Sequence, residues 1–212
     1  MTGPARFHSS VHGFVLTGGR SSRMGRDKAL LPFGDRSLAA WMAKVLQKVC
    51  GKVSLVGSRE KYSGLGFPVV EDIFTDSGPL AGIHAALVHS DTPFSLIVGC
   101  DMPNLSPDFL DRLLEIALEG DSDAVVPESE AFGYEPLCAV YSRNCLPRIE
   151  EALRNEERKV SSIFPRLRVR PVIYREWQAY DPLGKLFQNL NTLEDYEQAR
   201  TKLLREKRTS AD

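Results

Sequence analysis

The sequence predicts an α/β fold with a mostly parallel central sheet and helices on both faces. Short apolar segments alternate along the chain with longer segments in which apolar residues recur at helical spacing. Of the 212 residues, 42% are hydrophobic, which is enough for one sizeable core. We therefore expect a single domain over 1–212, in which 1–12 and 205–212 form flexible tails.

The strands and helices of this fold can be placed from local signals. Ser37 precedes a run of apolar residues at helical spacing, and Ser106 precedes a proline and a second such run, so both serines are expected to cap helices. Thr192 and Asp195 resemble a capping box for the last helix. A further helix is expected over GPLAGIHAALVHS, 78–90. The expected strands are 13–17, 52–57, 67–72, 94–101, 123–127, 136–141 and 168–174.

Composition excludes several classes of function. The formal net charge is -1, so charge gives no reason to expect nucleic acid as a partner. No apolar run approaches the length needed to span a membrane, and the N-terminus lacks a signal-peptide pattern, so we expect a cytoplasmic protein. The four cysteines have no metal-finger spacing and are expected to be reduced, buried thiols.

Ligands of parallel α/β sheets bind at the carboxyl ends of the strands, so these ends are the candidate site. The stretch VLTGGRSSRMGRDKALL places glycines directly after the first strand, and Arg20, Arg23, Arg26 and Lys28 follow in the same loop. Glycines allow the backbone to approach a ligand closely, and arginine and lysine bind phosphate. The spacing differs from both the P-loop and the dinucleotide fingerprint. The loop nevertheless indicates a nucleotide polyphosphate as the ligand.

Asp101 follows the most apolar strand, SLIVGC, and therefore lies where that strand emerges from the core. A carboxylate at such a place can hold Mg²⁺, which usually takes one or two protein carboxylates together with substrate phosphates. The alternative is an aspartate that caps the following turn. The cationic loop nearby favours the metal, so Mg²⁺ is the expected cofactor.

At the level of motifs, the chain resembles the molybdenum cofactor guanylyltransferase family. LTGGRSSRMGRDKALL is similar to the family signature LAGGxSxRMGxDK. VVEDIFTDSGPLAG, VGCDMPNL and FQNLNTLEDYEQA follow in the same order, so the resemblance extends over roughly 14–200. It implies a Rossmann-like nucleotidyltransferase fold and the transfer of GMP from GTP to molybdopterin, with release of pyrophosphate.

The resemblance also implies roles for individual residues. Arg23, Lys28 and Asp101 would be catalytic, with Asp101 as the Mg²⁺ ligand, and Asn189 and Asn191 would face the pterin. If Asn189 and Asn191 lie on extended backbone, both face the same side and Leu190 points into the core. The nucleotide would be bound by the first glycine loop, by an acid after the third strand, by a second loop over GPLAG, and by the two charged residues: Leu16, Thr17, Gly18, Gly19, Lys28, Asp72, Gly78, Leu80, Gly82 and Asp101.

Two positions depart from the family pattern. Thr17 replaces an alanine, and its small side chain should be tolerated. Val56 occupies the position where some relatives have an asparagine that meets the nucleotide, so that contact is not expected here. His84 follows GPLAG and is expected to be a helix-surface histidine rather than a catalytic base, because a phosphate nucleophile needs none.

Three other functions remain open. A molybdopterin cytidylyltransferase has a very similar fold, although Gly19 and the GPLAG segment favour guanine. A sugar-phosphate nucleotidyltransferase would use a similar loop, and a nucleotide-binding adaptor without turnover would not need Lys28 and Asp101. The expected partners are GTP and molybdopterin, without nucleic acid or membrane. Transient contact with enzymes that make or receive the cofactor is left open.

Overall fold

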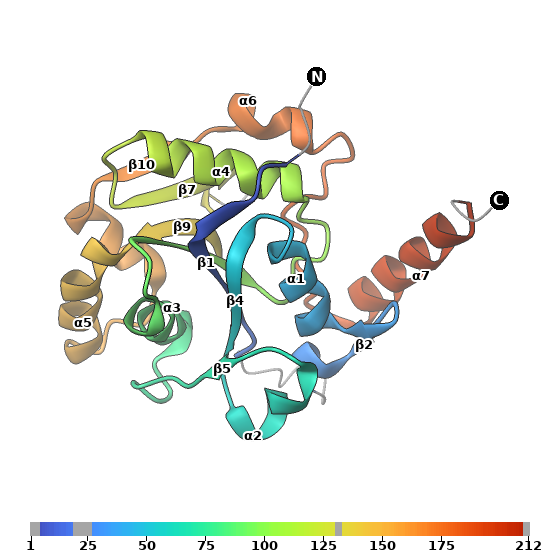
Figure 1. Cartoon of the computed structure of the whole chain (residues 1–212), viewed down its shortest axis with the longest axis horizontal. Helices are drawn as coiled ribbons and strands as arrows, with labels where there is room; N and C mark the ends of the chain where they lie inside the picture. The colour runs from blue at the N-terminus through green and yellow to red at the C-terminus, as the bar shows by residue number, and fades with distance from the viewer. Residues whose placement is uncertain (1–4, 19–26, 130–132, 210–212) are drawn as a thin grey trace.

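The structure is a computed structural model that describes residues 5–18, 27–129 and 133–209, with side chains described up to residue 204. Its centre is an eight-stranded sheet with the order β10-β7-β9-β6-β1-β4-β5, to which β8 adds beside β7 (Figure 1). The sheet strands are β1 His8–Leu16, β4 Cys50–Val56, β5 Val69–Val70, β6 Phe94–Gly99, β7 Ala124–Ser129, β8 Gly133–Tyr134, β9 Cys138–Ser142 and β10 Val169–Val172. A separate hairpin pairs β2 Pro32–Phe33 with β3 Arg36–Ser37.

The sheet is mixed and mostly parallel, as expected. β1 is parallel to both β4 and β6, and β5 and β10 each run parallel to their neighbour. β9 is antiparallel to β6 and β7, because it returns along the sheet between them. The carboxyl ends of β1, β4, β5 and β6 consequently meet at one edge.

Helices cover both faces of the sheet. They are α1 Leu38–Leu46, α2 Arg59–Tyr62, α3 Gly78–His89, α4 Pro107–Glu119, α5 Leu146–Arg154, α6 Tyr174–Trp177 and α7 Leu193–Thr209. Successive residues of β1 alternate between two cores: Val15 packs with α1 and α4, whereas Phe14 and Leu16 pack with α3 and α5. The C-terminal helix α7 extends away from these layers (Figure 1).

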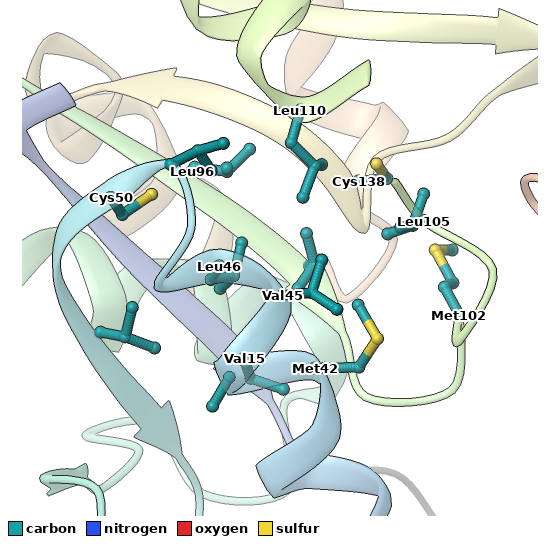
Figure 2. Packing of buried hydrophobic residues seen from close by; sticks show 14 of the residues in the cluster. Val15, Met42, Val45, Leu46, Cys50, Leu96, Met102, Leu105, Leu110 and Cys138 are labelled. Atoms are coloured by element: carbon teal, nitrogen blue, oxygen red, sulfur yellow. The ribbon is translucent and has the colours of Figure 1, made fainter. Parts of the chain in front are cut away.

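The core beneath α1 and α4 fixes the loop that follows β6. In Figure 2, Met42 and Val45 of α1 lie close to Met102, while Leu110 of α4 lies above Cys138 and Leu105. Met102 and Leu105 are almost fully buried in this cluster. They therefore anchor both sides of a short turn directly after Asp101.

The predicted helix caps are confirmed. The Ser37 hydroxyl accepts a hydrogen bond from the Ala40 N–H, and the Ser106 hydroxyl accepts one from Phe109. At the start of α7, the Asp195 N–H donates to Thr192 Oγ1, and Asp195 Oδ2 accepts from the Thr192 N–H at 2.8 Å. All four cysteines are free and buried, also as predicted.

Several expected boundaries are corrected. Residues 8–12 belong to β1 rather than to an N-terminal tail, because β4 pairs with them, and α7 continues to Thr209. The strand expected over 67–72 is reduced to two paired residues in β5. No helix among the described residues has both the length and the apolar character needed to cross a membrane.

Candidate active site

The end of β1 is held between its two neighbouring strands. The Thr17 N–H and hydroxyl both donate to the Val56 carbonyl, at 3.0 and 2.6 Å, and the Cys100 N–H donates to the Leu16 carbonyl at 3.0 Å. The Thr17 side chain thus binds β4 and does not enter the space beyond the strand. Among the residues that the structure describes, no atom lies within 4 Å of the position of a Cβ at Gly18, so the backbone there faces a space that these residues leave open.

Lys28 is positioned by the residue before it. Asp27 caps the short 3-10 turn of Lys28–Leu30 by accepting from the Ala29 N–H at 3.1 Å. Its other carboxylate oxygen accepts from the Tyr62 hydroxyl at 2.9 Å and lies 3.5 Å from Lys61 Nζ. These contacts tie the end of the glycine loop to α2 and direct the neighbouring ammonium group towards the sheet edge.

Lys28 and Asp101 form an ion pair at the carboxyl end of β6. Lys28 Nζ lies 3.1 Å from Asp101 Oδ2, and both side chains are largely shielded from solvent, at 16% and 25% exposure. The carboxylate folds back over Gly99, where a Cβ would lie 2.7 Å from Asp101 Oδ1. A side chain at position 99 would therefore displace the carboxylate.

A cavity of about 490 Å³ lies beside the ends of β1 and β4 and the start of α3. Its volume is within the range of small-molecule sites. Five of the residues predicted to bind the nucleotide line it, together with Pro79 of the predicted GPLAG loop, Val56 and three residues that were not predicted: Leu16, Gly18, Val56, Asp72, Asp76, Ser77, Gly78, Pro79, Gly82 and Arg158.

The GPLAG segment forms the first turns of α3 and not a second loop. Ser77 makes no side-chain cap at this end, so the first N–H groups of the 12-residue helix, apart from Pro79, which has none, can face an anion. Gly82 brings α3 close to β1, since a Cβ there would lie 3.3 Å from Leu16 Cδ2. Leu80 is fully buried in the core and does not line the cavity.

Asp72 brings a carboxylate into the same cavity. Desolvation by the surrounding protein raises its pKa, and the charge of nearby His84 acts in the opposite direction. His84 itself is buried, with its ring edge-on to Phe74 and Nε2 3.5 Å from Glu150 Oε1. The expectation of a surface histidine is therefore wrong: the helix turns position 84 towards α5.

A second cavity, of about 740 Å³, lies between the β7 end, α6 and the segment before α7. Asn189 and Asn191 both line it, while Leu190 between them is buried against Leu38 and Tyr196. The predicted alternation of this segment is therefore confirmed. The other lining residues come mostly from the irregular chain after β10: Ser129, Tyr174, Trp177, Asp181, Gly184, Lys185, Phe187, Gln188 and Asp195.

Backbone hydrogen bonds beside the ion pair connect the walls of the two cavities. Cys100, which precedes Asp101, is bonded to Leu16 of the first wall, and the Asp101 carbonyl accepts from the Leu190 N–H at 2.9 Å. The pKa of Asp195 is lowered mainly by its hydrogen bond with Thr192, and the charge of Lys28 contributes. Lys28 and Asp101 line neither cavity themselves, but the charge of Lys28 reaches Asp195 in the wall of the second.

The sequence matches the MobA-like NTP transferase domain over residues 13–171, about three quarters of its length. The chain belongs to the MobA-like NTP transferase family. A relative named "Probable molybdenum cofactor guanylyltransferase" in Pelotomaculum thermopropionicum is 39% identical over 89% of this chain and 91% of the relative. The crystal structure of molybdopterin-guanine dinucleotide biosynthesis protein A from Archaeoglobus fulgidus superposes with a TM-score of 0.79, at 25% identity, over 92% of this chain and 99% of that one.

MobA-like nucleotidyltransferases typically depend on a metal ion. One structure of the same fold, Rv0371c of Mycobacterium tuberculosis, is a complex with manganese, with a TM-score of 0.60 at 19% identity over 91% of this chain and 98% of that one. Among the residues described here, no cluster of three or more His, Cys, Asp or Glu side chains could hold a metal alone. The single carboxylate of Asp101 fits a Mg²⁺ ion that takes its other ligands from substrate phosphates and water.

Two of the predicted MobA-like site residues, Gly19 and Arg23, lie outside the described part of the chain. Arg158 and Tyr174 are the main lining residues that the sequence alone did not indicate. Arg158 follows α5, far along the chain from the other walls of the first cavity, and no local motif marks it. Tyr174 ends the strand expected over 168–174, whereas in the structure it is the first residue of α6.

Proposed function

We propose that this protein transfers GMP from GTP to molybdopterin and releases pyrophosphate. The observation that carries the proposal is the Lys28–Asp101 pair, whose backbone neighbours are hydrogen-bonded to the walls of two separate cavities. A group-transfer enzyme needs a donor site and an acceptor site that meet at the reacting atoms. The pair lies where the two sites would meet.

The first cavity is assigned to GTP. Its floor is the open backbone at Gly18, and the uncapped start of α3 supplies N–H groups and a favourable helix dipole for phosphate. Asp72 supplies a hydrogen-bond acceptor for the nucleotide. Gly19 and Arg23, on the adjoining part of the glycine loop, are proposed to contact the nucleotide and its phosphates.

The second cavity is assigned to molybdopterin. Asn189 and Asn191 present amide groups, which both donate and accept hydrogen bonds, as the polar edge of a pterin requires. The bond from Leu190 to Asp101 fixes this segment relative to the ion pair. The proposal places the terminal phosphate of the acceptor next to the α-phosphorus of a nucleotide held in the first cavity.

In the reaction, an oxygen of the acceptor phosphate bonds to the α-phosphorus while the bond to the β-phosphate oxygen breaks. The Lys28 ammonium group stabilises negative charge on the phosphates. Asp101 is proposed to hold Mg²⁺, which when bound stabilises charge on the leaving pyrophosphate. The nucleophile is already an anion, so the reaction does not require a protein base such as His84.

Nucleotide competition in a turnover assay tests the proposal. The protein is incubated with molybdopterin and Mg²⁺, and pyrophosphate release is compared for GTP, CTP, ATP and UTP. We expect GTP to be preferred. Equal turnover with CTP would indicate a cytidylyltransferase, and binding of GTP without pyrophosphate release would indicate an adaptor.

A further inference from the structure

Three aromatic rings form a continuous row along the second cavity. The Tyr174 ring meets Trp177 edge to face, with centroids 4.9 Å apart, and Trp177 meets Phe187 in the same way at 4.9 Å. All three side chains line the cavity. Neither the glycine loop nor the asparagine segment accounts for this row.

The row is held rigidly from behind. Trp177 Nε1 donates to the Glu128 carbonyl at 3.2 Å, so the indole is fixed to β7. Glu176, beside it, forms an ion pair with Arg170 of β10 and accepts from the Ile173 N–H at 3.1 Å. These contacts fix the short helix α6, on which Tyr174 is the first residue.

Within this row, Tyr174 presents the accessible ring. Trp177 and Phe187 retain only 4% and 7% of their exposure, whereas Tyr174 retains 46%. Single exposed rings are common on protein surfaces, but Tyr174 lines a cavity and ends a fixed aromatic row, so its ring is available for stacking with a ligand. The edge contact with Trp177 leaves the orientation of the Tyr174 ring fixed.

The polar groups of the cavity suit a flat ligand with a polar edge. Asn189 and Asn191 contribute amides, and the Asp181 carboxylate is already engaged by the N–H groups of Lys185 and Leu186. The Lys185 side chain makes no ion pair with any other described residue. An aromatic face beside two amides suits a flat heterocycle with a polar edge.

We propose that the rings of the pterin stack on Tyr174, while Asn189 and Asn191 contact its polar edge. The inference rests on the proposed function and specifies how the acceptor is bound. A guanine base is the competing flat ligand. It is assigned to the first cavity, where the phosphate-binding features lie, so the two ligands should be distinguishable by their effect on Trp177.

Tryptophan fluorescence provides a direct binding measurement. The chain has two tryptophans, Trp41 and Trp177, so a Trp41→Phe variant reports on Trp177 alone. We expect molybdopterin to quench this emission and GTP to leave it nearly unchanged. In the same background, Tyr174→Ala should raise the Kd for molybdopterin about 5- to 100-fold, the usual effect of losing an aromatic stacking partner.

Matched variants separate stacking from other causes. Tyr174→Phe keeps the ring and should bind within about twofold of the parent. Tyr174→Leu keeps the bulk without the π face and should resemble Tyr174→Ala. If Tyr174→Ala does not fold, as judged by its thermal melt, Tyr174→Leu supplies the comparison. Phe7→Ala removes another exposed ring, 60% accessible and ahead of β1, and should have no effect on binding.

Either of two affinity results would overturn the inference: an unchanged Kd for molybdopterin in Tyr174→Leu, or an equal loss of affinity in Tyr174→Phe and Tyr174→Leu. Quenching by GTP instead of molybdopterin would also overturn it, by placing the nucleotide here. Pyrophosphate release by the unmodified protein is measured in parallel. If no pyrophosphate is released, the proposed function is refuted. If pyrophosphate is released normally but the Tyr174 variants bind molybdopterin with an unchanged Kd, only the stacking surface is refuted.

Discussion

The two cavities are built in different ways. The walls of the first come mainly from strand ends and a helix start, where the backbone is fixed by the ladders of β1, β4 and β6. The walls of the second come mainly from irregular chain between β10 and α7, which is held by side-chain bonds such as those of Asp181 and Trp177. The sheet and its helices therefore determine the shape of the first cavity, whereas the segments between β10 and α7 determine the shape of the second.

This difference indicates how the function is divided. In the proposed assignment, nucleotide binding would use backbone groups that any chain with this sheet can present, which suits the part common to many nucleotidyltransferases. Recognition of the acceptor would depend on particular side chains carried by a loop, which can vary without disturbing the sheet. We call the Lys28–Asp101 pair between the two cavities the junction. Substitutions at the junction should impair the use of both substrates, whereas substitutions in one cavity should impair the binding of one substrate.

Asp101→Asn should have the largest effect, because Asp101 lies at the junction. A neutral amide binds Mg²⁺ poorly and no longer pairs with Lys28, so we expect kcat to fall about 100- to 1,000-fold, as for other losses of transition-state electrostatics. Steady-state kinetics at saturating Mg²⁺ measure this fall in kcat. Asp121→Asn, at a carboxylate that is 97% exposed, is the control. Near-normal turnover would remove Asp101 from the proposed metal site.

Lys28→Ala should have the next largest effect. Loss of a charge-assisted contact with phosphate costs about 1.5–3 kcal/mol, which corresponds to a fall in kcat/KM for GTP of roughly 10- to 150-fold. Lys52→Ala removes a lysine that pairs with Asp91 instead and should leave kcat/KM unchanged. An unchanged kcat/KM for GTP in Lys28→Ala would contradict the assignment.

The Asn189→Ala, Asn191→Ala double variant should affect the acceptor alone. Each lost hydrogen bond is worth about 1 kcal/mol, so the KM for molybdopterin should rise roughly tenfold or more while the GTP affinity stays nearly intact. The Asn191 contribution to the α7 cap comes from its backbone N–H, which alanine keeps. Thermal stability should therefore change little. Normal molybdopterin binding in a variant that melts several degrees lower would show a structural role instead.

Asp72 should give the smallest and most pH-dependent effect. The pKa of Asp72 is raised, so its carboxylate is protonated at a higher pH than that of an ordinary aspartate. As the solution is acidified, GTP affinity should therefore begin to fall at that higher pH. Asp72→Asn should lose this pH dependence and a few-fold of affinity at neutral pH. A pH titration of GTP binding measures both, and an identical profile in the two proteins would exclude Asp72 as the titrating group.

The same group makes a prediction about stability without ligand. A carboxyl whose pKa is higher in the folded than in the unfolded protein destabilises the fold above the folded pKa and has no such effect below the unfolded pKa. Asp72→Asn should thus melt slightly higher than the parent at neutral pH and show no such advantage in acid. Thermal melts across this pH range provide the measurement.

The sequence predicts the first cavity better than the second because local signals determine it. Ser37 and Ser106 are recognisable helix caps. Asp72 and Asp101 each follow an apolar run, so the placement of these two carboxylates at one sheet edge follows from the parallel strand order. The antiparallel course of β9 is not encoded locally, because its residues are as apolar as those of a parallel strand.

Other features depend on contacts between distant segments. His84 looks like a surface residue until α5 is packed against α3, and Arg158 reaches the first cavity only through that same packing. The alternation of Asn189 and Asn191 was predictable, but the aromatic row beside them was not, since Tyr174 and Phe187 are brought together by the course of an irregular segment. The glycine-loop roles of Gly19 and Arg23 stay predictions.

The buried cysteines have a consequence for the chemistry that this protein can tolerate. Burial raises the pKa of all four thiols, to about 12 for Cys50 and Cys145, so they stay protonated at neutral pH. A protonated thiol without solvent contact is a poor metal ligand and a poor nucleophile. In a protein of molybdenum cofactor synthesis, such thiols do not compete for the metal of a bound cofactor, and oxidants meet no reactive thiol on the protein surface.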